Sequence, residues 1–204
     1  AARVSPTNIG LLLNARQAAC DFGFLTVPEF ITLTDRTLTT IARLAKFRGH
    51  LFNWYDTQTL EPLGDAPFVS SVDSGNFVAS LYTLRSGALE LIKQPLLSPH
   101  LFTGLRAYRQ LMQSLKEVPA SLARFDLPGN HVAVSDWIAW LPDASAALSG
   151  ARAESGDPWW LNEMRLRVDA LQCLVRNYMP WLQREYAPLL ELLEVAHKSE
   201  AHCL

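Results

Sequence analysis

The 204-residue sequence lacks long hydrophobic runs and clusters of basic residues. Its apolar runs fall far short of the roughly 20 residues that span a bilayer, so we expect no membrane contact by this segment. Nucleic-acid binding requires clustered Lys and Arg that neutralise phosphates. With 18 basic and 20 acidic residues, a net charge of −2 and no basic stripe, the chain is not expected to bind nucleic acid.

Paired cysteines and metal-ligand motifs are also missing. Cys20, Cys173 and Cys203 form an odd, widely spaced set, which argues against a disulfide framework and for a reducing compartment. The histidines show no metal-ligand spacing, so we predict no metal and no cofactor. The sequence has no P-loop, dinucleotide fingerprint or Gly-x-Ser-x-Gly. What remains is a globular composition, 49% hydrophobic and 19% charged, with enough residues for a sizeable core.

Apolar residues recur at helical spacing along most of the chain, which predicts an all-α fold. Ser5-Pro6 and the capping-box pair Thr26 and Glu29 predict two helix starts. Pro142 should kink or break the helix that contains it. We expect a single domain over residues 1–204, built from antiparallel helical hairpins. The expected helices cover about residues 5–22, 26–48, 74–93, 98–115, 157–178 and 181–197, and a further short helix starts at residue 135 with Pro142 near its middle.

Two polar runs, the first of them rich in aromatic residues, lie in and next to the long connection between the second and third predicted helices. They are residues 49–57, GHLFNWYDT, and residues 69–76, VSSVDSGN. Long loops on a rigid scaffold often carry function. An aromatic ring can stack on the C–H face of a sugar, while Asp and Asn exchange hydrogen bonds with its hydroxyls. These runs therefore predict a carbohydrate site.

Each candidate residue has a structural alternative. Asp73 either points into a cleft or caps the helix that follows it. Trp54 and Tyr55 either form a sugar platform or pack in the core. Thr7 and Asn8, in the first turn of the first helix, either bind substrate or cap that helix.

Catalytic residues are not evident from the sequence. Glycoside chemistry needs two carboxyl groups about 5–9 Å apart. Asp73 and Asp56 are the candidate site carboxylates, and no glutamate lies in a convincing acid/base context.

Five runs resemble the glucoamylase-like domain of cyclic β-1,2-glucan synthases. They agree with that family in order and spacing, and they cover residues 5–11, 21–23, 48–57, 61–63 and 69–76. The match is sharp over residues 3–92 and is mainly a helical pattern over residues 93–204.

The resemblance implies a middle domain of a large enzyme of the bacterial inner membrane, whose soluble parts face the cytoplasm. It implies an (α/α)₆ toroid that closes linear β-1,2-glucan into a ring by retaining transglycosylation through a covalent glycosyl-enzyme. By motif match, Asp73 and Asn76 would face the cleft near the cleavage point. Trp54, Tyr55 and Asp56 would shape that cleft.

The glutamates that look catalytic in this family lie in later motifs, which residues up to Leu204 do not match. We therefore expect the N-terminal half of the domain, inactive by itself, with β-1,2-glucan oligosaccharide and the other synthase modules as partners. Apolar faces that the missing half would cover predict self-association. The alternatives are a segment of an inverting β-1,2-glucanase, a non-catalytic glucan-binding or module-packing segment, and a helical protein–protein scaffold.

Overall fold

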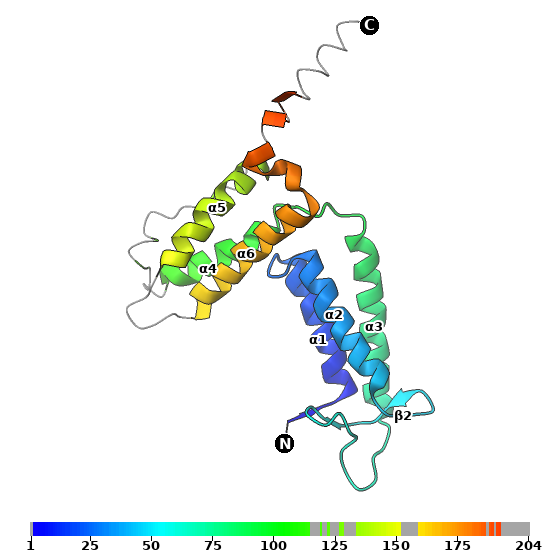
Figure 1. The fold of residues 1–204 in the computed structure, drawn as a ribbon. Helices are drawn as coiled ribbons and strands as arrows, with labels where there is room; N and C mark the ends of the chain where they lie inside the picture. Colours follow the sequence, from blue (N-terminus) through cyan, green and yellow to red (C-terminus); the bar gives the residue numbers. More distant parts are fainter. Residues whose placement is uncertain are drawn as a thin grey trace, which may run out of the picture. The chain divides into compact units, whose positions relative to one another are not determined.

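The computed structural model describes the chain as a set of helices with very little sheet. The described residues are 2–114, 119, 122, 127–128, 134–151, 159–186, 188–189 and 191–192. Within them lie six α-helices: α1 (Pro6–Asp21), α2 (Val27–Arg43), α3 (Ser71–Leu91), α4 (Leu101–Ser114), α5 (Val134–Gly150) and α6 (Trp159–Tyr178). The predicted all-α fold is confirmed (Figure 1). Among the described helices, none combines the length and hydropathy that a membrane-spanning helix needs.

Backbone contacts divide the chain into two compact units, which we name the N-terminal unit (Ala1–Leu96) and the C-terminal unit (Leu97–Leu204). The N-terminal unit holds α1 to α3, and the C-terminal unit holds α4 to α6. The expectation of one domain over residues 1–204 is not tested by this division. It stays a prediction, as does the toroid.

The first two helices begin at the predicted capping sequences. Ser5 Oγ accepts from the Asn8 backbone N–H (3.3 Å), and Asn8 Oδ1 accepts from the Ser5 N–H (3.1 Å). At α2, Glu29 Oε2 accepts from the Thr26 N–H at 2.8 Å, which completes the predicted capping box. Each pair satisfies N–H groups that a helix start leaves without intrahelical partners.

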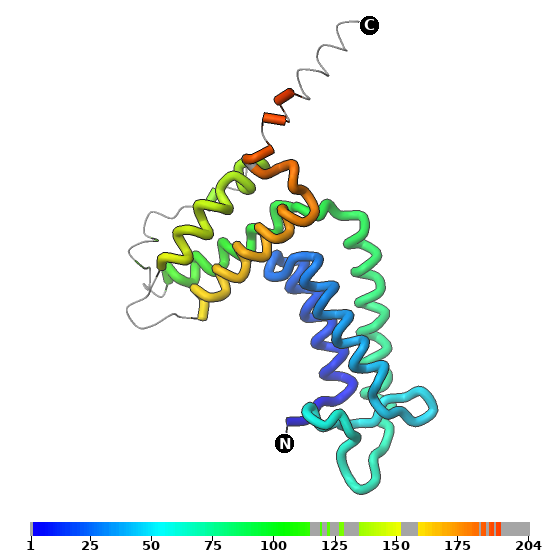
Figure 2. Tube along the Cα trace, in the orientation of Figure 1, coloured from blue at the N-terminus to red at the C-terminus, as the bar shows by residue number. Residues whose placement is uncertain are grey.

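In the N-terminal unit, α1 and α2 form an antiparallel hairpin, and α3 lies along α1 (Figures 1 and 2). The α1–α3 contact depends on small side chains. A Cβ atom added at Gly10 would lie 2.6 Å from Ser80 Oγ, closer than real Cβ contacts come. Two small apolar clusters fill this unit, one of Ile9, Leu44, Leu51 and Tyr55, the other of Leu13, Cys20, Phe30 and Leu84.

The connection from α2 to α3 differs from the prediction. Helix α2 ends at Arg43 instead of near Arg48, because the Lys46 ammonium donates to the backbone carbonyls of Ile41 and Ala42 in the last turn and of the C-cap residue Leu44. Residues 46–51 then form a hairpin of β2 (Lys46–Phe47) and β3 (His50–Leu51). Arg48 (φ 50°) and Gly49 (φ 85°) form its two-residue turn, so Gly49 is a turn residue and not a helix stop.

Two further short strands tie the chain's start to this connection. Strand β1 (Arg3–Val4) pairs antiparallel with β4 (Tyr55–Asp56), with Val4 opposite Tyr55. Helix α3 begins at Ser71, three residues before the predicted start, because Ser70 is its N-cap. The Ser70 hydroxyl oxygen accepts from the Asp73 N–H at 3.1 Å, so neither Asp73 nor Ser74 is the cap.

In the C-terminal unit, α6 packs against both α4 and α5 (Figure 2). Helix α5 passes through Pro142 without ending there, contrary to the predicted break. Proline removes one helical hydrogen bond, and the buried Leu141, Ala144 and Leu148 on both sides of it hold the helix in the core. Phe102 of α4 stacks on Trp137 of α5 at 3.8 Å between ring centroids.

Helix α6 ends before Pro180, as predicted, and the 3-10 helices η2 (Pro180–Leu182) and η3 (Arg184–Tyr186) follow. The last predicted helix, residues 181–197, therefore starts as 3-10 turns over its first described residues. Residues 187, 190 and 193–197 of that helix, and the predicted start of α6 at Asp157, lie outside the described residues.

Candidate functional site

Three segments that are distant in sequence meet at one end of the N-terminal unit, where α1 and α3 begin (Figure 1). The first turn of α1 supplies Thr7, the connection supplies Asn53 and Trp54, and the first turns of α3 supply Asp73 and Asn76. Two of the predicted site residues, Thr7 and Asp73, are thus brought into contact across 66 positions of sequence. We call these five residues the loop site.

Asp73 is the centre of the loop site. Thr7 Oγ1 donates to Asp73 Oδ1 at 2.6 Å, and Asn76 Nδ2 donates to Thr7 Oγ1 at 3.2 Å. With the Asn53 amide turned so that both of its polar atoms find partners, its nitrogen donates to the second carboxylate oxygen, Asp73 Oδ2, at 2.8 Å. The predicted residues Thr7, Asp73 and Asn76 therefore form one hydrogen-bonded chain that joins α1 to α3.

Trp54 is held by the same network. The Asn53 amide is oriented by its partners, so that its oxygen accepts from Trp54 Nε1 at 3.0 Å while its nitrogen faces Asp73. The Arg3 guanidinium lies over the Trp54 ring, 4.4 Å from its centroid. This cation–π contact covers one face of the indole. A sugar would have to stack on the other face or displace Arg3.

The charge state of Asp73 follows from these contacts. Hydroxyl hydrogen bonds, from Thr7 first and then from Ser70, lower the pKa of the Asp73 carboxyl below its ordinary value, against a smaller opposing effect of burial. Its position in the first turn of α3 also favours the anion, because a helix N-terminus carries partial positive charge. Asp73 is therefore a carboxylate at neutral pH, suited to accept hydrogen bonds and unsuited to act as a general acid.

Tyr55 lies in the core instead of the loop site. Its side chain is 0% exposed, its hydroxyl donates to the Ala45 carbonyl (2.6 Å), and it accepts from the Phe52 N–H (2.8 Å). Burial raises the pKa of Tyr55, and the Phe52 N–H opposes that shift. Of the two roles left open for Tyr55, its environment fits core packing, since no ring face is left for a sugar.

Asp56 and Asn8 serve the backbone. Asp56 Oδ1 accepts from the N–H groups of Gln58 (2.7 Å) and Thr59 (3.0 Å), and these bonds, Thr59 first, lower the pKa of Asp56. Asn8 caps α1 through Ser5. Both side chains have a structural task that accounts for their position, so the capping alternative fits Asn8, and Asp56 is a turn residue.

Three contributors to the loop site were not predicted. Asn53 was in the quoted run but was not chosen, although its amide can both donate and accept hydrogen bonds. Ser70 could have been found, because it lies three residues before Asp73 at N-cap spacing. Nothing in the local sequence links Arg3 to Trp54, since only strand pairing brings them together.

The arrangement can bind a polar ligand but offers little chemistry. A carboxylate has about four lone-pair positions, so Asp73 can accept from ligand hydroxyls in addition to Thr7 and Asn53. Asp56 Oδ1 is occupied by turn N–H groups, so this carboxylate has a structural task in the connection. Cys20 is not a nucleophile at neutral pH: burial first, and then Asp21 and Glu29, raise its pKa to about 11.

Comparison with known proteins finds similarity to a glucan synthase. No family model matches the chain. The chain is 43% identical over 117 residues to a protein of Rhizobium meliloti (strain 1021) named cyclic beta-(1,2)-glucan synthase NdvB. The aligned stretch is 57% of this chain but only 4% of the relative. The chain is therefore a partial homologue of a cyclic β-(1,2)-glucan synthase and spans a small part of that protein's length.

Proposed function

We propose that the chain is a segment of a cyclic β-1,2-glucan synthase and that its loop site binds β-1,2-glucan during ring closure by retaining transglycosylation. The similarity to a cyclic β-(1,2)-glucan synthase, 43% over 117 residues, supports the synthase context. In this proposal the segment belongs to the glucoamylase-like middle domain at the cytoplasmic face of the inner membrane, and its partners are the glucan and the other synthase modules.

The observation that carries the binding role is the network from Thr7 through Asp73 and Asn53 to Trp54. It fixes an ionised carboxylate and an indole ring beside each other at the ends of two packed helices. Asn76, an exposed amide one turn after Asp73, adds further hydrogen-bonding capacity. A carboxylate, an amide and an aromatic face are the groups that recognise the hydroxyls and the C–H face of a sugar.

The same observation favours binding without catalysis by this segment. Retaining and inverting glycosidases both need a second carboxyl group beside the scissile bond. Asp73 is ionised and Asp56 is engaged in a turn. A second candidate is therefore a non-catalytic glucan-binding module, and a β-1,2-glucanase segment remains the alternative in which water replaces the acceptor sugar.

Calorimetric titration of linear β-1,2-glucan oligosaccharides into the chain tests the proposal. We expect saturable binding, and we expect Asp73→Ala and Trp54→Ala each to weaken it about tenfold or more. The reason is that each variant removes a direct contact and also disconnects Asn53. No glucan cleavage or transfer is expected from the chain alone.

The matched controls are an exposed acid and an exposed tryptophan outside the network. Asp65→Ala lies in the same connection, and Trp159→Ala replaces a ring that is 65% exposed in the C-terminal unit. Both should bind like the parent. Binding that survives Asp73→Ala and Trp54→Ala would contradict the proposed site.

We also propose that the chain associates with other copies or with the other modules. Large apolar side chains are exposed along all three helices of the N-terminal unit, including Leu11 in α1, Ile31 in α2 and Tyr82 in α3. Such surfaces favour association. Light scattering at rising concentration should show an increasing mean mass, whereas a constant monomer mass would contradict self-association.

A further inference from the structure

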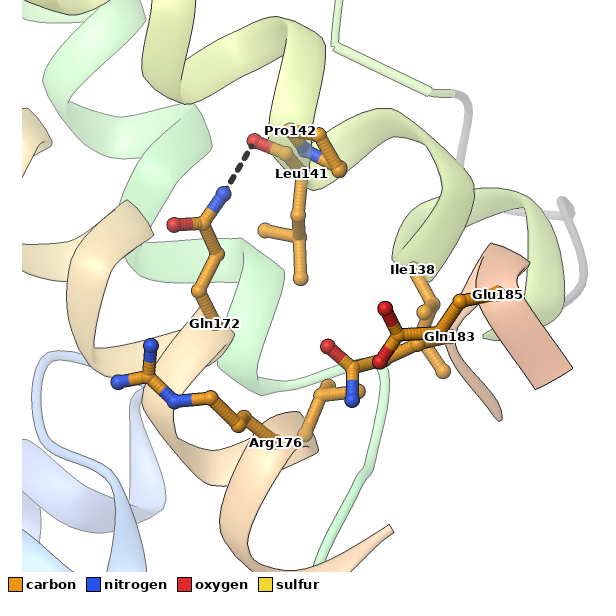
Figure 3. Close-up of a pocket in the computed structure, with 8 residues that line it drawn as sticks. Ile138, Leu141, Pro142, Gln172, Arg176, Gln183 and Glu185 are labelled. Atoms are coloured by element: carbon orange, nitrogen blue, oxygen red, sulfur yellow. Dashed lines mark hydrogen bonds between the residues drawn. The ribbon is translucent and has the colours of Figure 1, made fainter. Parts of the chain in front are cut away.

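A pocket lies in the C-terminal unit and shares no residue with the loop site. It lies between α5, α6 and the segment that contains η2 and η3, and its volume is about 440 Å³. That volume falls within the roughly 300–1,000 Å³ of small-molecule sites. Figure 3 shows the side chains that line it.

One wall of this pocket is apolar. Ile138, Leu141 and Pro142 contribute it from α5, and Val175 contributes from α6. Pro142 has no N–H, so the carbonyl of Ile138, one turn earlier, lacks its ordinary helical donor. The wall thus combines carbon surface with an adjoining backbone acceptor.

Two amide side chains border the pocket from different elements. Gln172 Nε2 donates to the Leu141 carbonyl at 3.0 Å, which fixes the amide beside the apolar wall (Figure 3). Gln183 Nε2 donates to the Pro180 carbonyl at 3.3 Å. In both cases the amide nitrogen is anchored by the backbone and the amide oxygen is left as an acceptor for a ligand.

Two opposite charges complete the lining. In Figure 3, Arg176 lies on the same side as Gln172, and Glu185 lies on the other side with Gln183. Among the residues that the structure describes, neither the Arg176 guanidinium nor the Glu185 carboxylate makes a hydrogen bond or an ion pair. An anionic ligand would be repelled by Glu185 and a cationic one by Arg176, so the lining favours a ligand without net charge.

These features together select the chemistry of the ligand. Its hydroxyls would donate to the Glu185 carboxylate and the two amide oxygens, and would accept from the five N–H donors of Arg176. Its C–H face would cover the apolar wall formed by α5. We infer that this pocket binds a neutral sugar of mono- or disaccharide size. The inference does not depend on the proposed function of the loop site.

A nitrogen-15 NMR titration of the full chain with sophorose, the β-1,2-linked disaccharide of glucose, tests this site. We expect saturable shifts of the Gln172 and Gln183 side-chain amides. Arg176→Ala and Glu185→Ala should each raise the dissociation constant about two- to tenfold, because each removes a hydrogen-bonding partner. Both side chains are exposed, so neither change should unfold the chain.

The control is Asp169→Ala, an exposed acid on α6 outside the lining, which should leave the dissociation constant unchanged. The Trp54 indole N–H signal reports the loop site separately, so failure at one site is distinguishable from failure at the other. Unshifted Gln172 and Gln183 signals, an equal loss in Asp169→Ala, or tighter binding of glucose 1-phosphate than of sophorose would overturn the inference.

Discussion

The two units of the chain build their interiors in different ways. In the C-terminal unit, α6 alone buries seven apolar side chains: Trp160, Leu161, Met164, Val168, Leu171, Leu174 and Val175. In the N-terminal unit, the buried apolar side chains form two clusters of four residues each. There the helices are joined in addition by side-chain hydrogen bonds between distant segments, such as Thr7 to Asp73.

This difference shows why the candidate binding residues are positioned in the N-terminal unit. Apolar contacts are non-directional and tolerate small shifts, whereas a hydrogen-bonded network works only with fixed distances and angles. The N-terminal unit uses such a network at the end where its helices begin, and it thereby gives Trp54 and Asp73 defined positions. The C-terminal unit combines a larger apolar interior with hydrogen bonds from α6 side chains to backbone carbonyls of α5, such as Gln172 to Leu141.

The largest expected effect comes from breaking the apolar interior of the C-terminal unit. Leu161 in α6 is 0% exposed, and Leu161→Ala should reduce the free energy of unfolding by about 2–5 kcal/mol, because it leaves a cavity. Urea denaturation followed by circular dichroism measures the change. Leu166→Ala on the same helix, at a side chain that is 47% exposed, should cost well under half as much. Equal losses of unfolding free energy in the two variants would show that Leu161 is no more tightly packed than Leu166.

An intermediate effect is expected where α1 approaches α3 in the N-terminal unit. Gly10→Ala should destabilise by about 1–3 kcal/mol, because the new methyl group would collide with Ser80. Alanine is the better helix former, so an unobstructed site would show the opposite sign. Thermal unfolding of the parent and of Gly10→Ala measures the sign and the size of this change.

Gly75 in α3 is the matched control, because a Cβ atom there has nothing within 4 Å. Gly75→Ala should stabilise by up to about 1 kcal/mol. A stabilising Gly10→Ala would show that α1 and α3 are not closely packed, and the double variant Gly10→Ala with Ser80→Gly should recover part of the loss.

The smallest effect is the pH dependence of the network. The pKa of Asp73 is lower in the folded chain than its ordinary value near 3.9. The contribution of ionised Asp73 to the free energy of unfolding is therefore fully present above that value. It is lost as the pH falls through the pKa of the folded chain. Below about pH 4, hydrogen exchange around Thr7 and Asp73 should accelerate more in the parent than in Asp73→Asn, whose amide does not titrate there. Identical pH profiles would contradict the network.

The parts of the fold that sequence predicted are those set by neighbours along the chain. Helix periodicity and the caps at Ser5 and Thr26 were correct, because a cap joins residues only three positions apart. The end of α2 and the start of α3 were misplaced by a few residues. Lys46 binds carbonyls at the end of α2 before Gly49 is reached, and Ser70 caps α3 in place of Asp73 or Ser74. Pro142 was expected to kink or break its helix, and the break does not occur, because buried side chains on both sides keep α5 continuous there.

At the candidate site, the sequence by itself determined the residue types: a carboxylate, amides and a tryptophan gathered in two runs between helices. Only the tertiary structure decided which of them meet. It placed Asp73 against Thr7 and Asn53, placed Arg3 over Trp54, and placed Tyr55 in the core. The physical reason is range: caps and turns depend on groups a few residues apart, whereas these contacts exist only once helix packing and strand pairing have brought distant segments together.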